Sequence, residues 1–476
     1  MQKWLNKNKQ NLIFVAIFVA LFLIFFRKVF PIKGILGHNW DWSFPALNFL
    51  FQKIDLLSRY TWWDFNLGIP LSLNLSQLGP NTLVKILAFL LLPKSVILIL
   101  IFLICLIAFL SFKKLLDFIN QKTFLNYLPS FLYTFSPFLF NDIIGGSWYM
   151  WISYALAPWF FISLVKFAKV GHFKNLLGVL LSSIFVIASL QHFLLIEIIV
   201  FLYLSFELFI NHDLNLKKII LRYFVAQITS ITFNLYWLLP FVYSFGNLTK
   251  SASQFSFTGA FASVRFSTQN LLSIASLVGY LDRNLYYFAL TKPLVALMSF
   301  SVFLIWAAVL GFFIWGEKRA KIKASGWLII LFLLALLIKG GNEPLGELTM
   351  WIYNHFPLMK LYRSPQHLMF SAAFIVPVLI SFSLKFFYQR FKYKKLILAG
   401  FVFCLFFWLD GWWFNGDLGH TILKNQKRDY IDFYQLSPGI SEIYRQNEKS
   451  QTDYRVFFLP PVNSPAYLPN EYQNLA

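Results

Sequence analysis

Charged residues are scarce in this sequence, and acidic residues are the scarcest. Asp, Glu, Lys and Arg make up 13% of the 476 residues, and Asp and Glu together number 20. A soluble domain of this size would carry about 25% charged residues, so a soluble globular protein is excluded. Hydrophobic residues take the place of the missing charge, at 58% of the chain with a mean hydropathy of +0.63. The composition predicts a polytopic membrane protein.

Cysteine is nearly absent as well. The chain has two, Cys105 and Cys404, and both lie inside apolar runs, which is typical of small buried hydrophobic residues. They exclude a disulfide framework and a thiolate metal site. An Asp-x-Asp motif is also missing. The sequence therefore predicts no certain cofactor and leaves a divalent cation as an open alternative.

The formal net charge of +21 is distributed in short Lys and Arg tracts between apolar runs, which argues against nucleic acid as a partner. Such tracts are typical of loops that stay on the cytoplasmic side of a membrane. We expect roughly eleven membrane spans in an all-α polytopic fold. They lie at about 12–30, 94–112, 125–140, 149–168, 175–191, 193–211, 219–243, 293–315, 326–339, 366–386 and 395–413.

The basic tracts also predict the orientation. With a retained first helix and a cytoplasmic N-terminus, every expected inside segment is basic. These segments are 1–11, 113–124, 169–174, 212–218, 316–325 and 387–394. The longer segments then fall outside, which predicts a transmembrane domain over 1–413 and an extracytoplasmic segment over 414–476. We expect 31–93 to be a first outer loop with an interfacial helix, and the tail to begin a β-containing domain that is incomplete.

Four short stretches place polar groups together on the expected outer face. The first, NWDWSFP, supplies Asp41 between Trp40 and Trp42. The others are FNDIIGGSWYMW, SLQHFLLIE and LMKLYRSPQHLMF, and their candidate residues are Asp142, Gln191, His192, Lys360, Arg363 and His367. Ionisable groups at a membrane are costly, so these are candidate functional residues. Glu197, within an apolar run, is expected to pair with a neighbouring side chain.

This set of side chains suits sugar transfer from a lipid phosphate. A carboxylate can take the proton of an acceptor hydroxyl that attacks the anomeric carbon. Arg and Lys can stabilise the charge on a departing phosphate, and Trp rings can stack on sugars or anchor at the interface. We expect Asp41 and Asp142 as catalytic residues, and the other candidates as substrate ligands.

The layout is similar to the GT-C superfamily of membrane glycosyltransferases. Within it, the stretches DWSFP, WWDFNLGIPLSLNLSQLGP, NDIIGGSWYMWISYALAPW and FPLMKLYRSPQHLMF resemble mycobacterial-type arabinofuranosyltransferases and YfhO-like bacterial membrane proteins. The resemblance implies a polyprenyl-phosphate sugar donor, a glycan, lipid or protein acceptor, and a base soon after the first helix, where Asp41 stands. It also implies a bacterial cell membrane. Paired acids near the first loop, common in that superfamily, are not present here.

Each candidate also has a purely structural interpretation. Asp41 and Asp142 can cap helices or solvate loops, His192 can be a satisfied buried histidine, and Arg363 can extend to lipid headgroups. Two other functions stay open for the whole chain. One is a lipid or glycan transporter or flippase, although no internal repeat supports it, and the other is a non-catalytic assembly protein with the same fold.

Overall fold

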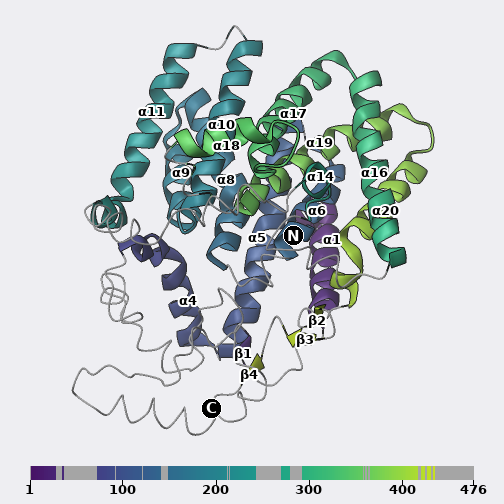
Figure 1. The fold of residues 1–476 in the computed structure, drawn as a ribbon, viewed down its shortest axis with the longest axis horizontal. Coiled ribbons are helices and arrows are strands. Elements are labelled where there is room, and N and C mark those ends of the chain that lie inside the picture. Colours follow the sequence, from purple (N-terminus) through teal and green to yellow (C-terminus); the bar gives the residue numbers. More distant parts are fainter. Residues whose placement is uncertain are drawn as a thin grey trace.

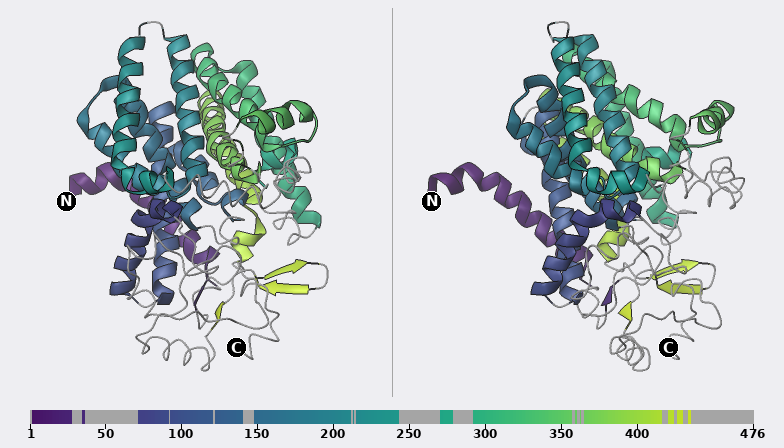
Figure 2. Two further views of the ribbon diagram at one scale, coloured as in Figure 1. Left: turned by 60° about the vertical axis from the view of Figure 1, so that its left-hand side comes forward. Right: turned by 90° about the vertical axis from the view of Figure 1, so that its left-hand side faces the viewer.

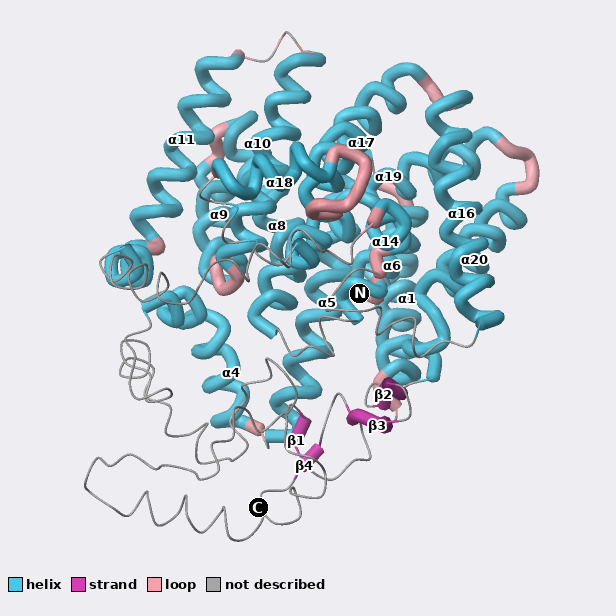
Figure 3. Tube along the Cα trace, viewed as in Figure 1, coloured by secondary structure: helices cyan, strands magenta, loops and turns pink. Residues whose placement is uncertain are grey.

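The protein is described here from a computed structural model. It describes residues 2–27, 35–36, 72–91, 93–120, 122–140, 148–211, 213, 215–242, 270–278, 292–356, 359, 362, 365–415, 420–423, 426–429 and 433–434. Nearly all of this chain is helical (Figure 1; Figure 3). The long helices are α1 Gln2–Phe25, α4 Leu78–Leu90, α5 Pro93–Asn120, α8 Trp148–Val170, α9 Phe173–Val186, α10 Leu190–Ile210, α11 Leu216–Phe233, α16 Lys292–Trp315, α17 Lys318–Ile338, α19 Met369–Arg390 and α20 Lys394–Asn415.

Shorter elements join these helices. They are η2 Ser72–Gln77, η3 Phe124–Asn126, α6 Tyr127–Thr134, α14 Leu271–Ser276, α18 Gly346–His355 and η5 Pro365–Leu368. Two small antiparallel strand pairs complete the described chain. In one, β2 His420–Leu423 pairs with β3 Gln426–Asp429, and in the other β1 Ile35–Leu36 pairs with β4 Phe433–Tyr434. The described chain is thus a helical protein with short strands in the first expected outer loop and in the tail.

Helix α19 forms the centre of the molecule. Its residues from Met369 to Leu384 are all buried, and it packs against α5, α6, α10, α16, α17 and α20. Helix α8 is the second buried helix, and it runs parallel to α5, with the Ser111 hydroxyl donating to the Ala155 carbonyl at 2.7 Å. Aromatic rings fill much of the space between helices. Tyr133 and Tyr154 stack at 4.0 Å, and each hydroxyl donates to the other residue's carbonyl.

Six helices in the described ranges are long and apolar enough to cross a membrane, and a seventh counts if one bent pair is a single span. The six are Leu98–Asn120, Tyr149–Val170, Leu190–Ile210, Ala296–Trp315, Lys318–Ile338 and Met369–Arg390. The bent pair joins Leu216–Phe233 to Leu235–Val242 at 77°. A helical membrane protein is therefore confirmed, and the expected eleven spans are not.

Several expected boundaries differ from the structure. The expected span 125–140 is broken into η3, α6 and a further helical piece at 137–140. Helices α5 and α17 continue through 113–120 and 318–325, where we expected loops, because Lys and Arg are good helix formers. The turn before α10 is 187–189, so Gln191 and His192 lie in its first turn and not in the connecting turn.

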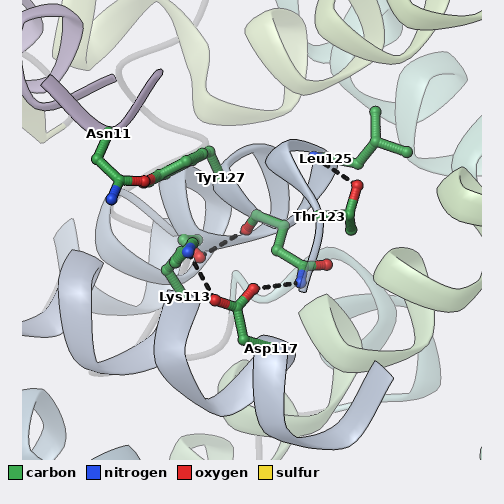
Figure 4. Close-up of polar contacts among 8 residues, drawn as sticks. Asn11, Lys113, Asp117, Thr123, Leu125 and Tyr127 are labelled. Carbon is green, nitrogen blue, oxygen red and sulfur yellow. Dashed lines mark hydrogen bonds and ion pairs between the residues drawn. The ribbon is translucent and has the colours of Figure 1, made fainter. Parts of the chain in front are cut away.

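The basic segments gather at one end of the helices. Lys169 Nζ forms an ion pair with Glu207 at 2.7 Å, and Arg222 Nη1 donates to the Lys169 carbonyl at 2.7 Å. Lys385 Nζ donates to the Asn120 carbonyl at 3.1 Å, and the Tyr127 hydroxyl donates to Asn11 Oδ1 at 2.5 Å (Figure 4). We call this the basic end. In both views of Figure 2 the α10–α11 turn lies at the top, at the far end of the molecule from the β2–β3 pair.

Candidate functional site

The first turn of α10 lies at the end of the helices opposite the basic end. Ser189 is the N-cap residue, and its hydroxyl accepts a hydrogen bond from the backbone N–H of His192 at 3.4 Å. Ser and Thr hydroxyls at this position satisfy one of the backbone donors that a helix start leaves free. The sequence SLQH therefore sets where α10 begins and directs Gln191 and His192 into its first turn.

His192 is buried against the start of α19. Its side chain has no exposed surface, and its ring stacks on Phe370 with centroids 4.5 Å apart and an interplanar angle of 21°. His367, in η5, lies close enough to act on the ring electrostatically, and the backbone of Met150, at the start of α8, lies near enough to be a weak hydrogen-bond partner of the ring. Three of the four polar stretches expected on the outer face therefore meet around this ring, and they lie on α8, α10 and η5–α19.

The ring nitrogens of His192 are the unusual feature of this packing. Neither Nδ1 nor Nε2 makes a hydrogen bond of ordinary geometry within the described part of the chain, although the backbone of Met150 lies near enough to act on the ring as a weak hydrogen-bond partner. Buried polar atoms are nearly always hydrogen-bonded, and an unpaired one calls for an explanation such as a ligand or a functional role. The imidazole is thus a buried donor and acceptor held in place mainly by its packing against Phe370.

Tyr362 joins the segment before η5 to the start of α10. Its hydroxyl donates to the Gln191 carbonyl at 2.7 Å, and its side chain is buried. Burial raises the pKa of the Tyr362 phenol above its ordinary value. The nearby phenol of Tyr353, in α18, also has a raised pKa, through burial first and the proximity of Tyr362 second. Both phenols are therefore neutral hydrogen-bond donors at physiological pH.

The C-terminus of α17 meets α18 beside these tyrosines. The Thr349 hydroxyl donates to the Leu336 carbonyl at 2.9 Å, and the Tyr353 hydroxyl to the Leu337 carbonyl at 3.4 Å. These side chains satisfy carbonyls that the last turn of a helix leaves free. Helix α18 is therefore fixed to the end of α17 by its own polar side chains.

Lys339 follows directly at this helix end and has no exposed surface. Its Nζ donates to the Asn342 carbonyl and, at 3.5 Å, to the Gly340 carbonyl. Burial lowers the pKa of Lys339, and the Glu343 carboxylate opposes that shift. A cation at a helix C-terminus is favoured by the helix dipole, so Lys339 brings a buried positive group to this end of the molecule.

The predicted site residues are only partly within the described chain. Gln191, His192 and His367 are described, and the structure brings the elements that carry them together. The rest lie outside the described residues, and they are Trp40, Asp41, Trp42, Asp142, Lys360 and Arg363. Sequence reasoning missed Tyr362 and Lys339. The sequence feature that could have pointed to Lys339 is a single cation immediately after an apolar run, on the side where the basic tracts are otherwise absent.

Two further features concern metal ions and Glu197. Within the described ranges, no group of three or more His, Cys, Asp or Glu side chains could hold a metal ion.

Glu197 pairs as expected, since its Oε2 accepts from the Tyr223 hydroxyl at 3.0 Å and from Gln227 Nε2 at 2.8 Å. Its Oε1 is buried and has no hydrogen-bond partner among the residues that the structure describes.

Comparison with known proteins gives no relative: no family model, no curated protein and no solved structure matches this chain.

Proposed function

We propose that this chain is a membrane glycosyltransferase of the GT-C type. It would transfer a sugar from a polyprenyl-phosphate donor to a glycan, lipid or protein acceptor at the outer face of a bacterial cell membrane. The observation that carries the proposal is the meeting of α8, α10 and η5–α19 around His192, at the end of the helices away from the basic end. The positive-inside rule assigns the basic end, with the N-terminus, to the cytoplasm.

The proposed reaction uses the candidate residues in separate roles. The acceptor hydroxyl oxygen forms a bond to the anomeric carbon as the bond from that carbon to the phosphate oxygen breaks. Asp41 takes the hydroxyl proton as general base. The polyprenyl phosphate leaves with the electron pair, and Arg363 and Lys360 stabilise its charge. Asp142 assists as the second carboxylate, and Trp40 and Trp42 hold the sugar or anchor the loop.

The described side chains would complete the donor site. Arg363 follows Tyr362 directly in the sequence, and Tyr362 is hydrogen-bonded to the start of α10. His192 is fully buried in the free protein, and its weakly bonded nitrogens would offer a donor and an acceptor to a sugar hydroxyl or phosphate oxygen once the donor substrate reaches the ring. Gln191 and His367 are the further polar ligands. The lipid bilayer is a further partner in this reaction, because the polyprenyl chain of the donor stays in the lipid.

Replacing Asp41 by Asn tests the assignment. The full chain is reconstituted in liposomes and given a panel of radiolabelled polyprenyl-phosphate sugars, with transfer to added bacterial cell-envelope glycan and lipid acceptors as the readout. Loss of a general base lowers a rate by about a hundredfold or more. The matched control is Asp213→Asn, which removes an exposed carboxylate at the α10–α11 turn and should keep full activity. Normal transfer by Asp41→Asn would remove Asp41 from the mechanism.

A lipid or glycan transporter is the second candidate, and Glu197 is the observation that favours it. A carboxylate within a membrane-spanning helix is rare and is a default sign of an ion or substrate pathway. Here one of its oxygens is buried and unpaired among the described residues. In the same liposomes, movement of labelled lipid between leaflets without sugar transfer, reduced in a Glu197→Gln variant, would favour transport. Absence of both activities would favour an assembly protein.

A further inference from the structure

Two of the lysines at the basic end that the structure describes near α5 and α8 are matched by an acid. Lys113 Nζ is 2.6 Å from Asp117 Oδ2 (Figure 4), and Lys169 Nζ is 2.7 Å from Glu207 Oε2. Lys114, Lys166 and Lys174 differ, because no carboxylate within the described ranges forms an ion pair with any of them.

These three lysines lie on three helices that pack side by side, α5 on α8 and α8 on α9, and two of them contact rings of the neighbouring helix. Lys114 is on α5, Lys166 on α8 and Lys174 in the first turn of α9. Both Lys114 and Lys174 lie close enough to Lys166 to repel its charge. Like charges held together without an acid are unfavourable in the free protein, so an anion placed among them would be stabilised by all three.

The start of α9 adds to the positive electrostatic potential near these three lysines. It is a helix of 14 residues that begins without an acidic residue in its first turn and without a side-chain cap. The backbone N–H groups at such an N-terminus favour a negative group. Lys174 lies in this turn, so the helix end and the lysine cluster act on the same region.

The surface beside the lysines is apolar and aromatic. Lys114 Nζ lies 4.6 Å from the ring centroid of Trp159, and Lys166 Nζ lies 5.3 Å from that of Phe118. Trp159 is 46% exposed and Phe173, beside Lys174, is 74% exposed. Exposed apolar side chains next to a cationic cluster match a molecule that has an acyl chain beside an anionic headgroup.

We propose that Lys114, Lys166 and Lys174, with Trp159 and the start of α9, form a binding site for an anionic phospholipid of the membrane. The headgroup phosphate binds between the three ammonium groups, and an acyl chain lies along the exposed Trp159 face. The site is at the opposite end of the helices from the His192 cluster and does not depend on the proposed glycosyl transfer. It would fix the basic end at the headgroup level of an anionic leaflet.

The test uses the full chain in phosphatidylcholine nanodiscs that contain spin-labelled phosphatidylglycerol or spin-labelled phosphatidylcholine. Electron paramagnetic resonance measures the motionally restricted fraction of each label, and hence the relative association constant of the anionic lipid. The variant K114Q/K166Q/K174Q should lower that constant about tenfold or more, since each lysine near an anionic surface contributes strongly.

Two matched variants distinguish a specific lipid-binding site from general electrostatic attraction between the basic end and an anionic membrane surface. K217Q/K218Q/K318Q removes the same charge from exposed lysines at the basic end and should change the constant by less than about twofold. K114R/K166R/K174R keeps the charge and should keep the selectivity, which also shows that substitution at these positions does not unfold the protein. Equal losses in the two glutamine variants, loss of selectivity in the arginine variant, or no selectivity in the wild-type protein would overturn the proposal.

Discussion

Two glutamates interrupt the apolar helix α10, and each accepts hydrogen bonds from neighbouring side chains. Glu207 accepts from Lys169, from the Tyr203 hydroxyl at 3.1 Å and from Asn211 at 3.3 Å. Glu197, deeper in the helix, has donors at one oxygen only. Buried charges are tolerated where they are paired and hydrogen-bonded. The pairing of Glu207 is therefore sufficient for a structural role, whereas that of Glu197 is incomplete.

Tyr362 provides a pH-dependent contribution to stability at the candidate site. Because burial raises its pKa, the folded protein keeps the phenol protonated, while the unfolded chain releases that proton above a pH of about 10. The stability from this shift is fully present below that pH and is lost as the pH rises through the raised pKa. We expect Tyr362→Phe to lose about 1 kcal/mol at neutral pH, from the hydrogen bond to Gln191, and to be less sensitive to alkali than the wild-type protein.

Thermal unfolding in detergent between neutral pH and pH about 11 measures both effects, since that range brackets the ordinary phenol pKa of about 10. Tyr393→Phe is the control, because that side chain is 70% exposed and its loss should leave the pH profile unchanged. Parallel alkaline profiles for the wild-type protein and Tyr362→Phe would contradict this assignment.

At the scale of the elements, the apolar runs predicted where helices exist better than where they end. Every expected run overlaps a described helix. Helices α5 and α17 nevertheless extend beyond their apolar runs through basic residues, because hydropathy reports burial in lipid and not backbone hydrogen bonding. The 77° bend after Phe233 was likewise missed, since no proline or glycine occurs at residues 233–235 to signal it.

Gly171 is the position where one residue decides how two helices meet. It joins α8 to α9 with a φ of +81°, and a Cβ there would lie 2.7 Å from Arg222 Nε. We expect Gly171→Ala to cost about 1–2 kcal/mol from the left-handed backbone alone. It should also displace Arg222 from the Lys169 carbonyl. A lower midpoint of thermal unfolding in detergent checks this.

Gly400→Ala is the matched substitution. No heavy atom lies within 4 Å of the Cβ it would add, and alanine is favoured over glycine in a helix by about 0.5–1 kcal/mol. Its unfolding midpoint should be equal to or above that of the wild-type protein. A Gly171→Ala midpoint as high as that of Gly400→Ala would show that the turn tolerates a side chain.

For the whole molecule, the distribution of basic residues predicted which helix ends lie together. Alternating inside and outside segments predicted that Gln191, His192 and His367 share one end, and the structure brings their elements together. The aromatic contact between His192 and Phe370 could not be predicted, because it depends on how α10 and α19 rotate about their own axes. The role of Tyr362 depends likewise on a hydrogen bond to a carbonyl 171 residues away in sequence.

Single cysteines test the proposed orientation. Cys105 and Cys404 are buried, so a Cys105→Ala/Cys404→Ala background carries Asp213→Cys at the α10–α11 turn or Thr421→Cys in β2. In intact cells, a membrane-impermeant maleimide should label Thr421→Cys only, and permeabilisation should add labelling of Asp213→Cys. Labelling of both in intact cells, or of Asp213→Cys alone, would contradict a cytoplasmic basic end.

The pairing of β1 with β4 has a consequence for biosynthesis. Ile35 and Leu36 pair with Tyr434 and Phe433, so the two strands are about 400 residues apart in the chain. Contacts of such long sequence separation form late, because the intervening chain must first be ordered. The ribosome releases β4 only after α20 has been synthesised. A nascent chain arrested before residue 433 therefore lacks this strand pair, however completely its helices have inserted.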